Sequence, residues 1–190
     1  MTKIRGSAKK AMTTPGQKGC YVIDHMVGAL ADHSSASIRR AVVLVDIDQH
    51  EGTTQAEIME RTGVGKSALN RDIDWMFNNG CIRRHEAQND GRKIKLRVSA
   101  FSQTHVDGAL DYFEGNHENL KTFLEGYIRI LKDDKATLRD AKILATLHEK
   151  RGATKQEVVE NLYQGSSATE NRAILRLIEE GLVRENESAA

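Results

Sequence analysis

Four side chains in the first half of the sequence have the types and spacing needed to bind both bases and phosphates of DNA. Lys66, Ser67, Asn70 and Arg71 fall within six residues, and at helical spacing Ser67 and Arg71 share a face with Asn70 beside them. An asparagine amide can pair with adenine and an arginine guanidinium with guanine, whereas serine and lysine mainly hold phosphates. We therefore predict a DNA-reading helix that carries these side chains at its N-terminal end.

A second basic group follows about twenty residues later. Two expected strands, Cys81–Glu86 and Lys93–Val98, flank an Asp-Gly pair that is typical of a tight hairpin turn. The second stretch alternates charged and apolar residues, so we expect one buried face and one basic face. Arg92, Lys93 and Lys95 are then candidate DNA contacts on this hairpin.

Capping and glycine signals predict the helices that carry these residues. Thr54 is followed three residues later by Glu57, a capping box that begins a helix over 55–61. Apolar residues at helical spacing predict one helix over 38–47 before it, and another from Ser67 to Gly80 after it. Three helices followed by a hairpin constitute a winged helix-turn-helix.

The same pattern occurs twice. Residues 38–68 and 138–168 are identical at ten of 31 positions with an offset of 100, and five further identities follow with an offset of 101. We infer a repeated unit of about fifty residues.

The second copy carries the candidate DNA contacts Ser167, Asn171 and Arg172. Glu170 stands among them, and residues 136–190 hold eight basic and nine acidic residues. Only the first strand of a hairpin is expected, over 182–184, so this unit has little or no wing. It is either a second DNA reader or a module for docking and dimerisation.

The remaining segments complete a mainly α fold with a small β-wing, in which a helical region separates tandem winged helix-turn-helix units. We expect a disordered basic arm over 1–19, the first unit with its preceding helix over 20–100, a helical linker or dimerisation region over 101–134, and the second unit over 135–190. An apolar stripe over 120–131 needs a cover, either a partner subunit or the same chain.

Composition excludes several classes of function. The net charge of +1 argues against a uniformly basic DNA-coating protein, and the charge is local, with nine basic and four acidic residues over 61–97. The apolar runs are too short for a transmembrane helix, and two cysteines cannot build a disulfide framework. We expect a cytoplasmic, nucleoid-associated protein.

Four other kinds of site were weighed. Gly65-Lys66-Ser67 resembles the end of a phosphate-binding loop, but the pattern needs a glycine where Glu60 stands. The seven histidines show no metal-ligand spacing, no catalytic constellation is apparent, and we expect no cofactor. Cys20 is either an inert buried thiol or a reactive thiol whose pKa is lowered by Lys18 and by the start of the adjacent helix.

Residues 20–132 resemble the MarR family of winged-helix transcription regulators, above all over 55–71 and in the hairpin Asn89-Asp90-Gly91-Arg92-Lys93. The resemblance implies a homodimer formed by terminal helices, a third motif helix in the major groove and a wing arginine in the minor groove. The second unit departs from the family pattern.

We therefore predict a sequence-specific regulator that binds double-stranded DNA, acting as a dimeric repressor on an inverted-repeat operator. Two alternatives remain open at this stage. One is a tandem winged-helix interaction subunit of a chromosome-condensing or segregation complex, which would bind a protein partner through the second unit. The other is a plasmid or phage replication initiator.

Overall fold

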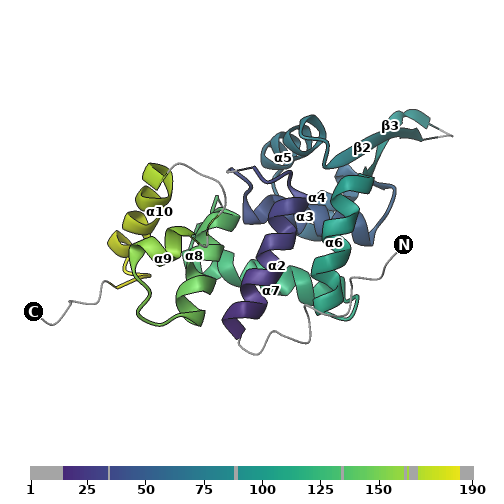
Figure 1. Cartoon of the computed structure of the whole chain (residues 1–190). Helices are drawn as coiled ribbons and strands as arrows, with labels where there is room; N and C mark the ends of the chain where they lie inside the picture. Colours follow the sequence, from purple (N-terminus) through teal and green to yellow (C-terminus); the bar gives the residue numbers. More distant parts are fainter. Residues whose placement is uncertain are drawn as a thin grey trace, which may run out of the picture.

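The computed structural model describes residues 15–33, 35–87, 90–133, 135–160, 162 and 167–184, and the side chains of 87, 90–93 and 167 lie outside this description. The chain is mainly helical, with one small antiparallel sheet (Figure 1). In chain order the elements are α2 (Pro15–Ala29), α3 (Ile38–Gln49), β1 (Thr53–Thr54), α4 (Gln55–Thr62), α5 (Lys66–Asn78), β2 (Ile82–Ala87), β3 (Asp90–Val98), α6 (Ala100–Tyr112), α7 (His117–Leu131), α8 (Leu138–Glu149), α9 (Lys155–Glu160) and α10 (Ser167–Glu179).

The first unit, from α3 to β3, is the winged helix that the sequence predicts. Thr54 caps α4 as expected: its hydroxyl accepts from the Glu57 amide while the Glu57 carboxylate accepts from the Thr54 amide. The helix ends at Gly63 in the left-handed conformation, with φ of 67°, which glycine adopts without a steric penalty. The three strands form a sheet in the order β1-β3-β2.

The second unit repeats the three helices without a described sheet. Thr154 and Glu157 form the same reciprocal hydrogen bonds at the start of α9. The strand expected over 182–184 does not form, because Leu182 and Val183 lie in bends after α10 and Arg184 has no regular structure. Gly181 carries φ of 72°, and Leu182 and Val183 fold back to donate their amides to the Leu177 carbonyl.

The helices outside the two units pack within the chain. α2 packs against both α6 and α8, and α7 packs against α3. Because α2 begins at Pro15, the expectation of a disordered arm was wrong for residues 15–19, while residues 1–14 lie outside the described residues. The apolar stripe of α7 is covered largely by the same chain, since Leu120 and Leu124 are fully buried. The helical region over 101–134 is therefore part of the core.

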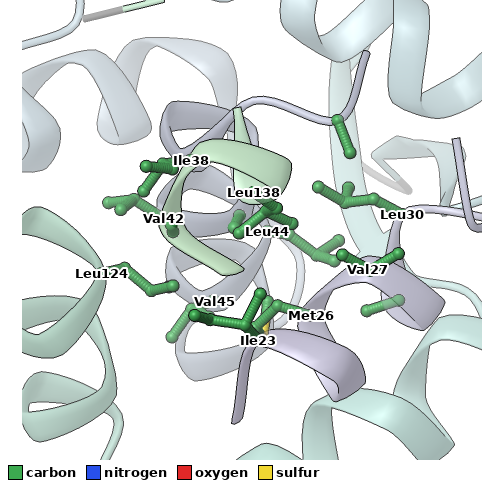
Figure 2. Close-up of a cluster of buried hydrophobic side chains, with 14 of the residues drawn as sticks. Ile23, Met26, Val27, Leu30, Ile38, Val42, Leu44, Val45, Leu124 and Leu138 are labelled. Atoms are coloured by element: carbon green, nitrogen blue, oxygen red, sulfur yellow. The ribbon is translucent and has the colours of Figure 1, made fainter. Parts of the chain in front are cut away.

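One continuous core joins the two units. Side chains of α2, α3, α7 and α8 converge in it, and Figure 2 shows Ile23, Met26, Leu44, Leu124 and Leu138 among them. Burial of aliphatic side chains contributes about 1.5–3 kcal/mol for each fully buried residue. This core holds both helix-turn-helix units in a fixed relation to each other.

Helices α2 and α6 approach closely because each carries a glycine opposite a histidine of the other. A methyl group placed on Gly28 would lie 2.4 Å from the His105 ring, and one placed on Gly108 would lie 2.2 Å from the His25 ring. Either contact is too short for real atoms, so these two positions need glycine. This close packing fixes α6 onto α2.

Candidate nucleic-acid interface

Helix α5 is fixed to α3 by a buried carboxylate. Asp72 is 1 % exposed and accepts hydrogen bonds from Arg39 Nε at 2.7 Å and Arg40 Nε at 3.0 Å. The Arg40 guanidinium also lies 4.4 Å from the centre of the Trp75 ring, in position for a cation–π contact. Two charge-assisted bonds to one side of α5 turn its opposite side outward.

Helix α4 is fixed to α3 by a second buried carboxylate. The fully buried Asp46 accepts from Arg61 Nη2 at 2.8 Å and Nε at 3.1 Å, and Arg61 also donates to the Thr53 hydroxyl at 2.7 Å. The bonds to Asp46 raise the pKa of Arg61 above its ordinary value. The helix-turn-helix is thus held by two buried carboxylates and the arginines paired with them, in addition to its apolar core.

The exposed side of α5 carries the predicted residues. Lys66, Ser67, Asn70 and Arg71 are all exposed, and neither Lys66 nor Arg71 forms an ion pair with any residue that the structure describes. The Gln55 side-chain amide of α4 donates to Asn70 Oδ1. That oxygen keeps a second lone pair, and the Asn70 NH₂ group remains available to donate. Asn70 is therefore held in place yet able to pair with an adenine edge.

Among the predicted contacts on the hairpin, the structure describes the side chain of Lys95. Neighbouring strand residues point to opposite faces, so Lys95 lies on the face opposite the buried Leu96. On the Lys95 face the strand register pairs Arg83 with Arg97 and His85 with Lys95. Arg83 and Arg97 are like charges directly opposite each other, which destabilises a sheet, and an anion bound there relieves this repulsion. Lys95 thus belongs to a basic face that does not adjoin α5.

The other hairpin face adjoins α5 and includes residues that sequence reasoning missed. A shallow hollow of about 230 Å³ lies between α5 and β3, with Gln55, Asn70, Arg84 and Ile94 in its lining. Arg84 forms an ion pair with Asp74 of α5 and lies 4.5 Å from the Phe77 ring centre. Gln55 could have been found from its position directly after the Thr54 cap. The side chains of Arg92 and Lys93 lie outside the described residues.

The second unit exposes some of the candidate DNA contacts at the equivalent helix, α10. Asn171 and Arg172 are exposed on α10, and Arg172 Nε donates to the Ala168 carbonyl at 3.2 Å. The Ser167 side chain lies outside the described residues. Glu170 does not face outward with the other polar residues of α10, because it is 1 % exposed and pairs with Arg139 of α8 at 2.9 Å. Burial raises the pKa of Glu170, against the opposing effect of Arg139. The carboxylate that distinguishes α10 from α5 is therefore directed away from the exposed Asn171 and Arg172.

The structure argues against a reactive thiol at Cys20. Its sulfur lies 3.7 Å from the Thr146 hydroxyl, and burial raises the thiol pKa despite the nearby Lys142. A raised pKa disfavours the thiolate that oxidant sensing needs. Among the described residues, no group of three or more His, Cys, Asp or Glu side chains could hold a metal ion.

These features define a class of protein. A helix-turn-helix with a hairpin wing, whose third helix exposes Lys, Ser, Asn and Arg, is a winged-helix DNA-binding unit. Residues 37–94, from the cap of α3 into β3, match the MarR family, and this segment is a MarR-like winged helix. The match indicates a DNA-binding transcriptional regulator, and proteins of this family are regulators rather than enzymes.

The other comparisons add no relatives. No curated protein and no solved structure matches the chain. Within the described residues, none of the helices has the length and apolar character needed to cross a membrane.

Proposed function

We propose that this protein represses transcription by occupying an operator in double-stranded DNA. The observation that carries the proposal is the exposed pair Asn70 and Arg71 on α5, a helix held rigidly by Asp72. Asn70 would pair with adenine and Arg71 with guanine in the major groove, while Lys66 and Ser67 would hold phosphates and set the register. Repression would be steric, because a protein seated over a promoter excludes the polymerase.

The basic hairpin supports this proposal as a second contact with the duplex. Arg83, Lys95 and Arg97 place three cations on one hairpin face, of which Arg97 also pairs with Glu51 at 3.2 Å. Such a face binds the phosphate backbone without regard to sequence, and it makes binding depend steeply on salt. No comparison favours the interaction subunit or the replication initiator.

The first test is a selection of random duplex DNA by the full chain across a salt titration, followed by sequencing. We expect retention that falls steeply with salt and an enriched motif containing an adenine next to a guanine contact. Lack of retention at about 100 mM salt would contradict the proposal, since specific DNA binders persist under these conditions.

The second test is Arg71→Ala on the selected site. We expect a loss of about 1–3 kcal/mol and relaxed preference at one base position, because a bidentate arginine discriminates by this amount. Arg129→Ala is the matched control, since Arg129 is exposed on α7 outside the winged helix. An equal loss on selected and random DNA would make Arg71 a phosphate contact instead of a base contact.

A further inference from the structure

The two units meet at a contact between equivalent residues. Ser37 and Thr137, which are related by the offset of 100, form an antiparallel bridge. The Ile38 amide donates to the Ala136 carbonyl at 2.9 Å, and the Leu138 amide donates to the Ala36 carbonyl at 2.9 Å. Reciprocal hydrogen bonds between equivalent residues are the mark of a local two-fold axis, as in an isologous dimer interface.

Backbone conformation repeats on both sides of this contact. Asp32 and Lys132 both carry φ of 52°, an uncommon value for residues other than glycine. Ser37 caps α3 by accepting from the amide three residues on, and Thr137 caps α8 in the same way. Gly52 and Gly152 have φ of 78° and 82°. The equivalence is therefore structural as well as sequential.

The helices that precede the two units are exchanged across the axis. α2, which precedes the first unit, packs on α8 of the second, and α7, which precedes the second, packs on α3 of the first (Figure 1). Polar contacts follow the same exchange: Cys20 lies 3.7 Å from Thr146 on α8, and Lys121 lies 3.7 Å from Asp46 on α3. A two-fold exchange of helices is an interface that ordinarily needs two chains, and here one chain contains both halves.

The exposed side chains of the third helices are equivalent under this arrangement. α5 and α10 both have thirteen residues, and their fifth and sixth positions are Asn70-Arg71 and Asn171-Arg172, all four exposed. Each of these helices is anchored by an arginine at the start of the first helix of its unit. Arg39 of α3 pairs with Asp72, and Arg139 of α8 pairs with Glu170. In Figure 1, α5 lies at the top of the molecule and α10 lies at its left end.

We propose that one chain is an internal two-fold pair that reads two half-sites of opposite orientation through α5 and α10, without a second copy. This inference rests on the proposed DNA-binding function. The two half-sites are bound unequally, because Lys66 of the first copy corresponds to Ser166 of the second, and a wing is described in the first unit alone. The Asn-Arg pair common to both helices selects the same base step in each half-site.

The test measures stoichiometry and footprint with the full chain on its selected duplex. Native mass spectrometry should show one chain per duplex, and hydroxyl-radical footprinting should show two protected half-sites, the second weaker. Two chains per duplex with a symmetric footprint would overturn the proposal and establish the homodimer expected from the sequence. One chain with one protected half-site would also overturn it, and would leave the second unit as a protein-docking module.

Variants separate this inference from the proposed function. Arg172→Ala should remove protection of the weaker half-site and lower affinity about 5- to 150-fold, the equivalent of 1–3 kcal/mol. Asn171→Ala gives an independent second variant, and Arg129→Ala should change neither half-site. If Arg71→Ala weakens binding while Arg172→Ala and Asn171→Ala do not, the internal pair is refuted and DNA binding by α5 stands. If neither arginine variant alters binding, the proposed function fails.

Discussion

Asp72 is the residue whose change should reveal most clearly how the DNA-reading helix is held. Asp72→Asn keeps the size of the side chain and removes its charge, which leaves Arg39 and Arg40 without their shared carboxylate. Removing one partner of a buried ion pair costs about 3–5 kcal/mol. Each arginine keeps 18 % of its side chain exposed, so water recovers part of this cost, and we expect a loss of about 2–4 kcal/mol.

Asp74 provides a matched control on the same helix. Its side chain is 62 % exposed, and it pairs with Arg84, which is 32 % exposed. Exposed ion pairs contribute about 0–1 kcal/mol, so Asp74→Asn should change the stability little. The two variants alter the same residue type two positions apart, and they differ chiefly in burial.

Urea unfolding at pH 7, followed by circular dichroism, measures the loss in free energy of unfolding for both variants, and thermal melts measure the change in Tm. At about 2–4 °C per kcal/mol for a chain of this size, Asp72→Asn should lower Tm by roughly 4–16 °C. The difference between the variants should persist at about 1 M salt, because salt screens a buried pair far less than an exposed one. Equal losses for the two variants, or a loss for Asp72→Asn that vanishes in salt, would refute the account of α5 as ionically anchored.

Two further predictions concern the helices that join the units. Gly108→Ala should destabilise the fold, because its methyl group would lie 2.2 Å from the His25 ring. Gly126→Ala is the control and should stabilise the fold by about 0.5–1 kcal/mol, because nothing lies within 4 Å of that position. Thermal melts that show equal effects for the two variants would contradict the close packing of α2 and α6. Burial, together with the charge of His105, lowers the pKa of His25 below 6.5, so the folded state favours the neutral ring. This stabilisation is complete above the unfolded pKa and is lost as pH falls below about 6.5. The drop in Tm from pH 7.5 to 5.5 should be smaller in His25→Asn than in the natural chain, and an equal drop would show that His25 does not contribute.

Local sequence signals are sufficient to predict the helices and strands of the first unit. The Thr54–Glu57 box predicts where α4 begins, because a cap is a contact between residues three apart and needs no tertiary partner. Alternation over 93–98 predicts the buried Leu96 and the exposed Lys95 for a similar reason. The exposed residues of α5 were predicted for the same reason, since their spacing fixes a helix face.

Local signals were insufficient where a long-range contact decides the outcome. In the sequence, Glu170 stands among polar residues of α10 that are expected to be exposed. In the structure it forms a buried ion pair with Arg139, which is 31 positions earlier. The strand expected over 182–184 does not form, because a strand needs a partner and no described segment pairs with it. Gln55 belongs to the site because the packing of α4 beside α5 brings its side-chain amide to Asn70.

The partner that covers the apolar stripe of α7 also depends on tertiary packing. The stripe of Leu120 and Leu124 predicts a buried face, but a hydrophobic face does not specify its partner. In the structure, this face of α7 packs against α3 of the same chain, and α2 packs against α8. The repeat that is visible in the sequence therefore becomes an internal two-fold arrangement only in the folded protein, because the hydrogen bonds between Ser37–Ile38 and Ala136–Leu138 join residues one hundred positions apart.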